Sequence, residues 1–281
     1  MEALASHGPT QSVRRRLVGP GLPARLLDLL LGIIGLGVII GGWWLLSTQM
    51  QAVQLPAPDV VWDAMWSNLW EMPALSYATF QSGGIADGLL YTTENVFIGV
   101  GLGLVLGLAT GLLMGRVRLA DGLLEPVLVA LGTVPVLIML PFIVTWFGTA
   151  RLAQTGLVIF FTFVTTATVV RNAVGNVAGS YEQSAAALGA PRSMVLRDVV
   201  LPAIVPEVLG AVRVCFAAGW GFEAIAEILG AQHGIGRIIQ TMGTQSATPE
   251  LMASVLWLAI VAVVVDGLLV LIGKWAIRWS E

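Results

Sequence analysis

The sequence predicts an all-α polytopic membrane protein with six transmembrane helices and both termini in the cytoplasm. Three observations predict this fold class: the composition, the length of the apolar runs and the placement of the basic residues. Of the 281 residues, 57% are hydrophobic and 11% are charged, whereas an average soluble domain has about 25% charged residues. This composition excludes a disordered chain, an ordinary soluble enzyme and a nucleic-acid-binding protein.

Six apolar segments approach the roughly 20 residues that a helix needs to cross a bilayer. They are continuous and do not alternate with period two, which argues against a transmembrane β-barrel; a buried soluble core is the other alternative. Four carry no charged residue, at 29–46, 96–115, 126–150 and 152–170. Two are interrupted: 199–222 contains Glu207 and Arg213, and 251–273 contains Asp266.

The basic residues orient these spans, because cytoplasmic loops of membrane proteins are enriched in Lys and Arg. A cytoplasmic N-terminus places Arg151 and Arg237 outside and Arg213 within a span. The remaining basic residues then face the cytoplasm, and they are Arg14, Arg15, Arg16, Arg25, Arg116, Arg118, Arg171, Arg192, Arg197, Lys274 and Arg278. The opposite orientation would place this whole set outside, so we expect both termini inside.

The chain divides at the start of the first span into a cytoplasmic tail, 1–25, and a transmembrane domain, 26–281. We expect the first apolar run to be an anchoring helix and not a cleaved signal peptide, because no small-x-small cleavage site follows it. The domain includes an outer segment at 55–87 and a long cytoplasmic loop at 171–200. In the outer segment Trp62, Trp66 and Trp70 recur every four residues, which predicts an interfacial helix with aromatic anchors or, alternatively, a docking helix for a delivery protein.

Glycine recurs on one face of the second span. The series is Gly99, Gly103, Gly107, Gly111 and Gly115. Small residues at this spacing let two helix backbones approach closely. The pattern predicts a close helix contact, either static or able to slide.

Several kinds of catalytic site are absent from the sequence. The only lysine, Lys274, is followed by Trp275, so no phosphate-binding loop of the form G-x-x-x-x-G-K-[ST] can be built. The only histidines are His7 and His233, and the only cysteine is Cys215, so we expect no zinc site, no catalytic residue and no cofactor bound by this chain.

Polar residues within the spans are the candidates for function or for pairing. Arg213 and Asp266 lie at similar depth, so we predict a buried pair between the fifth and sixth spans, more structural than pathway-lining. Thr162 and Thr166 on the fourth span are pathway candidates, with hydroxyl bonding to their own helix as the alternative. Four residues near the outer ends of the second and fifth spans form a candidate gate or docking rim: Glu94, Asn95, Glu223 and Glu227.

The cytoplasmic loop at 171–200 predicts two short helices separated by a turn. Ser180 is placed to cap the first helix, Gly189 to end it in a left-handed conformation, and Pro191 to begin the second. Leu201-Pro202 then marks entry into the fifth span.

This loop resembles the cytoplasmic signature of the membrane subunits of binding-protein-dependent ABC importers. That signature reads Glu-Ala-Ala, three residues, Gly, nine residues, Ile, one residue, Leu-Pro. At the same spacing this chain has Gln183-Ser184-Ala185, Gly189, Val199 and Leu201-Pro202. Gln183 and Ser184 depart from the pattern.

The resemblance extends over about 55–279 and is strongest to the branch that imports nitrate, sulfonates, taurine and bicarbonate. The supporting stretches are Leu55-Pro56-Ala57-Pro58, Trp146-Phe147-Gly148, and Ala226-Glu227-Ile228 followed by Gly234-Ile235-Gly236. Asn95 occupies a position where that branch has Arg, and Arg151 lies near one where it has an acid. A compensating rearrangement and a divergent substrate both remain open.

The resemblance implies an ABC importer permease in the inner membrane of a prokaryote, forming half of a translocation pathway for a small anion such as a sulfonate or nitrate. The implied partners are two cytoplasmic ATPase subunits that hold ATP and Mg, a second permease copy, an extracytoplasmic binding protein and membrane lipid. The implied ATPase-coupling residues are Tyr181, Glu182, Gln183, Ala185, Ala186, Gly189, Ala190 and Pro191. A secondary transporter and a non-transporting scaffold are the alternatives, and co-purification of an ATPase subunit discriminates them.

Overall fold

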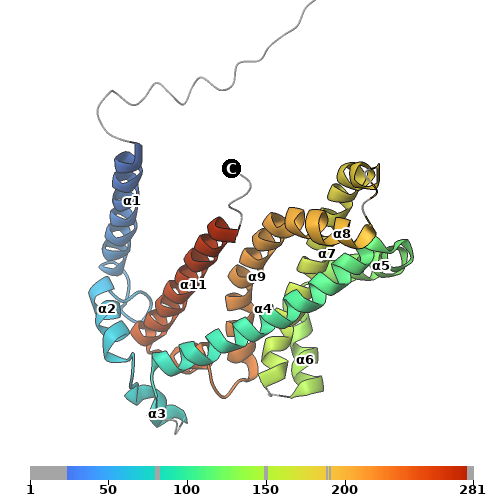
Figure 1. The fold of residues 1–281 in the computed structure, drawn as a ribbon. Coiled ribbons are helices and arrows are strands. Elements are labelled where there is room, and N and C mark those ends of the chain that lie inside the picture. Colours follow the sequence, from blue (N-terminus) through green and yellow to red (C-terminus); the bar gives the residue numbers. More distant parts are fainter. Residues whose placement is uncertain (1–23, 80–82, 149–150, 188, 190, 277–281) are drawn as a thin grey trace, which may run out of the picture. The chain divides into compact units, whose positions relative to one another are not determined.

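Long helices dominate the computed structural model, which describes residues 24–79, 83–148, 151–187, 189 and 191–276. Within these ranges no strand occurs (Figure 1). Five helices are long and apolar enough to cross a membrane, and a sixth crossing is present if one bent helix pair is counted as a single span. The all-α class and the six predicted crossings are confirmed in this sense.

Helix α1 (Ala24–Ser47) contains the first predicted span and belongs to a compact unit of its own, residues 1–58. The indole Nε1 of Trp43 donates a hydrogen bond to the carbonyl oxygen of Pro56 at 3.0 Å. This bond ties the segment that follows α1 back to the end of the helix. The second unit, residues 59–281, contains the remaining helices.

Helices α2 (Pro58–Ser67) and α3 (Pro73–Thr79) occupy the predicted outer segment. Each begins at a proline, which suits a first helical position because an N–H there would have no partner in the helix. Trp62 and Trp66 share α2, and their rings meet edge to face at 5.8 Å. Trp70 lies beyond the end of α2, so the prediction of one helix carrying all three tryptophans is wrong.

Helices α4 (Ile85–Arg116) and α7 (Arg151–Ala187) make the most extensive helix contact. A Cβ added at Gly103 would lie 2.6 Å from the Cβ of Thr162, and one at Gly107 would lie 2.6 Å from the Cβ of Thr166. Side chains of α7 therefore fill the positions that the glycines leave empty. The same contact continues along the two helices through Gly99, Gly111 and Gly115 against Val158, Val170 and Val174.

The third predicted span, 126–150, is not one straight helix. Helix α5 (Arg118–Thr133) is followed by the 3₁₀ turn η1 (Val136–Met139) and by α6 (Leu140–Phe147), and the chain bends by 89° between the two parts. Pro135 precedes η1 and Pro141 lies in the first turn of α6. A proline disfavours helical backbone in the residue before it, so the chain leaves the helix at Val134. The last two residues of the predicted span lie outside the described residues.

Helices α9 (Leu201–Gly230), α10 (Ile235–Thr244) and α11 (Thr248–Ala276) complete the second unit. Helix α9 packs against both α4 and α7. Val96 and Val100 from α4, Val158 from α7, and Cys215 and Trp220 from α9 belong to one buried apolar cluster. This three-helix contact brings the polar residues near the outer ends of the helices together.

Candidate functional site

The outer polar cluster, defined here as Thr92, Glu94, Asn95, Arg151, Glu223 and Glu227, lies where α4, α7 and α9 meet the start of α10. Thr92, Asn95, Glu223 and Glu227 are fully buried. The structure thus brings together the four residues that were predicted to form one group, which are Glu94, Asn95, Glu223 and Glu227. Thr92 and Arg151 were not predicted to belong to it.

Glu227 is held at the beginning of α10. The hydroxyl of Thr92 donates a hydrogen bond to Oε1 of Glu227 at 2.7 Å, and the backbone N–H of Gly236 donates one to Oε2 of Glu227 at 2.8 Å. The Thr92 hydroxyl also accepts a hydrogen bond from the N–H of Ile235 at 2.9 Å. Two N–H groups that the helix itself cannot pair are thereby satisfied, and the positive end of the helix dipole faces a carboxyl group.

The glycines around Glu227 are explained by this contact. Gly234 precedes α10 with φ at +103°, a conformation that side-chain-bearing residues rarely adopt. A Cβ at Gly236 would lie 2.7 Å from the Cβ of Glu227 and would also collide with the carbonyl of Ala224. The Gly234-Ile235-Gly236 stretch thus allows α10 to begin directly against the Glu227 side chain.

Glu223 is connected to the surface through Asn95 and Arg151. The amide Nδ2 of Asn95 donates to Oε1 of Glu223 at 2.8 Å. Nε of Arg151 donates to Oδ1 of the same Asn95, and its Nη2 pairs with Oε2 of Glu94 at 2.7 Å. Asn95 and Arg151, the two positions that the resemblance singles out as departures, therefore bond to each other, which favours a compensating rearrangement.

The outer polar cluster links three helices and contains both acidic and basic groups, so it can hold the outer ends of α4, α7 and α9 together. Oε2 of Glu223 has no hydrogen-bond partner within the described residues. This arrangement suits a gate contact that opens and closes better than it suits a resting site for an anion, because two carboxyl groups lie in its interior.

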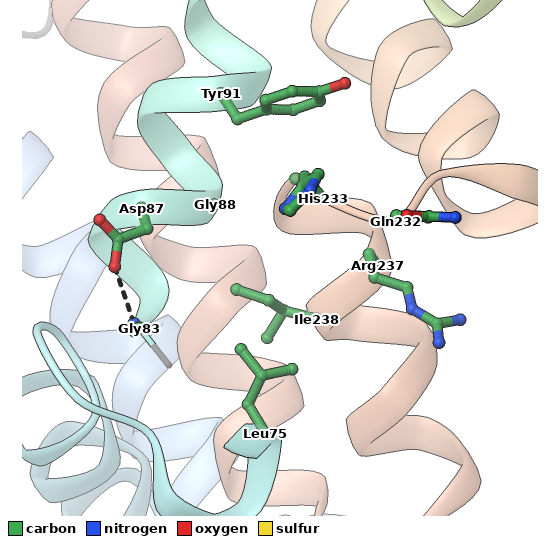
Figure 2. A pocket seen from close by; sticks show the side chains of 11 residues that line it. Leu75, Gly83, Asp87, Gly88, Tyr91, Gln232, His233, Arg237 and Ile238 are labelled. Atoms are coloured by element: carbon green, nitrogen blue, oxygen red, sulfur yellow. Dashed lines mark hydrogen bonds between the residues drawn. The ribbon is translucent and has the colours of Figure 1, made fainter. Parts of the chain in front are cut away.

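A small cavity lies beside the cluster, with a volume of about 140 Å³. Figure 2 shows Asp87 and Tyr91 along α4, with His233 just before α10 and Arg237 in the first turn of α10. Oδ2 of Asp87 accepts a hydrogen bond from the N–H of Gly84 at 3.1 Å, which fixes the start of α4. The sequence analysis missed Asp87 and Tyr91. Their spacing of four residues in a helix was the available signal.

Thr162 and Thr166 are fully buried in the contact with the α4 glycines. Their hydroxyl oxygens have no hydrogen-bond partner within the described residues, so the alternative of bonding to their own helix is wrong for these two, and the pathway role stays a prediction. Thr168 does follow the alternative, because its hydroxyl donates to the carbonyl oxygen of Val164 at 2.8 Å.

The predicted contact between Arg213 and Asp266 is confirmed. Nε and Nη2 of the guanidinium donate to Oδ1 and Oδ2 of the carboxylate, each at 2.8 Å. The predicted burial is wrong, because the two side chains are 48% and 47% exposed. An ion pair that the sequence analysis missed, between Arg171 of α7 and Asp121 and Glu125 of α5, joins the bent helix pair to the rest of the unit.

The loop at 171–200 differs from its prediction at its start. Helix α7 runs without a break to Ala187, so the separate helix predicted to begin at Ser180 is a continuation of the fourth span. Gly189 has φ at +77°, which confirms the left-handed turn. Helix α8 (Arg192–Val195) follows Pro191 directly, as predicted. Ala190 and the side chains of Tyr181, Glu182, Gln183, Ala185 and Ala186 lie outside the described residues.

The end of the signature leads into α9 through a short π-helix, η2 (Leu196–Val200). Val200 is fully buried in a cluster with Val195 and Ile204, and Val199 packs at its edge. Leu201 is the first residue of α9, and Pro202 lies in its first turn. The apolar candidate span that contains α9 begins earlier, at Ser193, ahead of the predicted entry at Leu201-Pro202.

Comparison with known proteins agrees with this arrangement. Residues 99–281 match the family described as "Binding-protein-dependent transport system inner membrane component". The chain is 27% identical over 238 residues to a taurine transport system permease protein of Escherichia coli (strain K12), covering 84% of each chain. It is 26% identical over 255 residues to a nitrate import permease protein of Synechococcus elongatus, covering 86% of this chain and 88% of that one.

The fold is shared with solved transporters. An inward-facing structure of the MetNI methionine ABC transporter matches with a TM-score of 0.60 at 19% identity, covering 73% of this chain and 99% of that chain. At this identity the match shows the fold alone. The family match covers more than half of the sequence, and the relatives align over most of its length. The chain belongs to the binding-protein-dependent transport system inner membrane components and is a permease subunit of an ABC importer.

Proposed function

We propose that this chain forms half of the translocation pathway of an ATP-driven importer, and that two copies assemble with two cytoplasmic ATPase subunits. ATP and Mg are bound by those ATPase subunits, and an extracytoplasmic binding protein delivers the solute. Family membership is the observation that carries this proposal, because the family consists of the inner membrane components of such systems.

The proposed contact with the ATPase is the last part of α7 together with the turn that leads to α8. It comprises Tyr181, Glu182, Gln183, Ala185, Ala186, Gly189, Ala190 and Pro191. Gly189 is exposed, and a Cβ built there would meet nothing within 4 Å, so the turn is open to a partner at this residue. The buried cluster around Val200 anchors the other side of the turn, which gives a force applied there a firm connection to α9.

The proposed solute is a small anion. Relatives that are named after a solute include a taurine permease and a nitrate permease. Taurine is a sulfonate, and nitrate is an oxyanion. In this proposal the 1–25 tail and the 171–200 loop face the cytoplasm, and the 55–87 segment lies outside. The outer polar cluster acts as the outer gate.

Reconstitution of the intact assembly tests the proposal. The chain is expressed with the ATPase and binding-protein genes that accompany it, purified by a tag on the permease, and placed in liposomes with ATP inside. We expect an ATPase subunit to co-purify, and uptake of labelled taurine or nitrate to require both ATP and the binding protein. Uptake driven by an ion gradient without ATP would instead support a secondary transporter, and co-purification without any uptake would support a scaffold.

A further inference from the structure

The ion pair between Arg213 and Asp266 is exposed at a depth where a lipid-facing charge is costly. Arg213 lies 12 residues past the start of α9, or about 18 Å, and Asp266 lies 10 residues before the end of α11, or about 15 Å, at 1.5 Å per residue. Both positions are therefore near the middle of a bilayer whose hydrocarbon core is about 30 Å thick. At this depth ionised side chains almost always face a protein interior or a water-filled cavity.

The chain itself does not bury the pair. Each side chain keeps nearly half of its surface exposed, although both charges already pair with ideal bidentate geometry. If this surface faced lipid, about half of each charged group would lie in hydrocarbon. Water in a passage between permease copies removes that cost without any further protein contact.

The residues around Arg213 on α9 differ from a lipid-facing surface. Small residues predominate among the exposed positions of that face, which also include one acid and one larger apolar residue; they are Ala203, Pro206, Glu207, Gly210, Val214, Ala217 and Gly221. A Cβ built at Gly210 or at Gly221 would meet nothing within 4 Å. The outer face of α11 instead exposes large apolar side chains, including Val263, which is 72% exposed, and Leu271.

We propose that the Arg213–Asp266 pair and this face of α9 line the aqueous translocation pathway, with Arg213 as a transient contact for the anionic solute. The proposal rests on the function proposed above and adds which face of the chain the solute passes. Small side chains leave room for a solute along α9, and Arg213 is the basic residue of this face, with Glu207 about two turns nearer the start of the helix.

The chemistry of the guanidinium suits a passing anion. A guanidinium has five N–H donors, and Asp266 engages one on Nε and one on Nη2. Three donors remain, including both on Nη1, so the edge formed by the two terminal nitrogens can still face an oxyanion. Because Asp266 neutralises the charge, an anion is attracted only weakly, which suits a site that the solute must also leave.

Thiol accessibility in the reconstituted, transport-active complex tests the proposal. Cys215 is fully buried, so the natural chain supplies an unreactive background, and a Cys215→Ala chain supplies a second one. Ala217→Cys and Gly210→Cys place single thiols one turn on either side of Arg213. Val263→Cys is the matched control, because it lies three residues before Asp266 on the exposed face of α11. The probe is a charged, membrane-impermeant methanethiosulfonate, which reacts with thiolates in water.

We expect Ala217→Cys or Gly210→Cys to react at least about tenfold faster than Val263→Cys, because a thiol in hydrocarbon does not ionise. Equal and slow reaction at all three positions, in a complex that performs ATP-driven uptake, would overturn the proposal while leaving the proposed function intact. Oxidative cross-linking of two copies through Ala217→Cys, with no reagent access, would overturn it in favour of a packed interface between permeases.

A second variant separates transport from packing. The double substitution Arg213→Gln with Asp266→Asn removes both charges together and leaves no unpaired ion. We expect the double variant to co-purify with the ATPase at natural yield and to take up the anion at about a tenth of the natural rate or less. Unchanged uptake by this variant would show that the pair does not contact the solute and would overturn the role assigned to Arg213.

Discussion

The hydroxyl of Thr92 has two hydrogen-bonding roles, and together they determine how α10 meets α9. It accepts from the N–H of Ile235 at 2.9 Å and donates to Glu227 at 2.7 Å. A hydroxyl has a single proton, so the accepted bond leaves that proton free to satisfy the buried carboxyl group. Removal of this one oxygen atom leaves the carboxyl group of Glu227 and the N–H of Ile235 each without one hydrogen-bond partner.

Thr92→Val tests this role, because valine keeps the shape of threonine and removes the hydroxyl. We expect the assembled permease to lose about 1–3 kcal/mol of stability, the usual cost of leaving a buried polar group unpaired. Thr168→Val is the matched control, since that hydroxyl is exposed and bonds only to its own helix. It should change stability by less than about 0.5 kcal/mol. Thermal unfolding in detergent measures both, and equal midpoints for the two variants would contradict the assignment.

At the scale of the element, the α4–α7 contact depends on the absence of side chains along one face of α4. A leucine at Gly107 would meet Thr166 and the carbonyl oxygen of Phe163, which lies 2.9 Å from the added Cβ. We expect Gly107→Leu to destabilise the permease by about 1–3 kcal/mol through overpacking. Gly101→Leu, on an exposed face of the same helix with nothing within 4 Å of its Cβ, should be near neutral. If thermal unfolding showed comparable losses of stability in the two variants, the α4–α7 contact would not depend on the glycine face of α4.

The turn after α7 gives a second prediction at this scale. Gly189→Val forces a β-branched residue into left-handed backbone, where a side chain costs roughly 1–2 kcal/mol, and it places bulk at the proposed ATPase contact. We expect membrane insertion to be normal and ATP-driven uptake to be lost. Gly175→Val on an exposed helical position of α7 should retain uptake. Natural uptake by the Gly189 variant would refute the coupling role of the turn.

At the scale of the whole molecule, charge placement predicts the orientation in the membrane. The set of basic residues predicted to be cytoplasmic includes Arg14 near one end of the chain and Arg278 near the other. A reporter that functions only in the cytoplasm should therefore be active when fused after Glu281, and inactive when fused to a chain truncated after Trp70. Activity of the second fusion would reverse the topology. A reporter that functions only outside the cytoplasm supplies the reciprocal control.

The sequence predicted the features that depend on local composition and missed those that depend on neighbours. The apolar runs predicted the spans, because every span must cross the same thickness of hydrocarbon with apolar residues. The pairing of Arg213 with Asp266 followed from matched depth, but its exposure did not, since exposure depends on which face of α9 meets α11. The bend after α5 was missed because its apolar sequence reads as one continuous run. Pro135 and Pro141 set the position of the bend, but the length and polarity of the run do not.

The unbroken length of α7 has a mechanical consequence. Its 37 residues extend over about 55 Å at 1.5 Å per residue, well beyond the roughly 30 Å of the hydrocarbon core. Its first residue, Arg151, bonds Asn95 in the outer polar cluster, and its last, Ala187, adjoins the turn proposed to meet the ATPase. A single helix thus connects the Arg151 bonds with the turn proposed to meet the ATPase, so a tilt imposed at that turn pulls on the Arg151 bonds at the other end of α7.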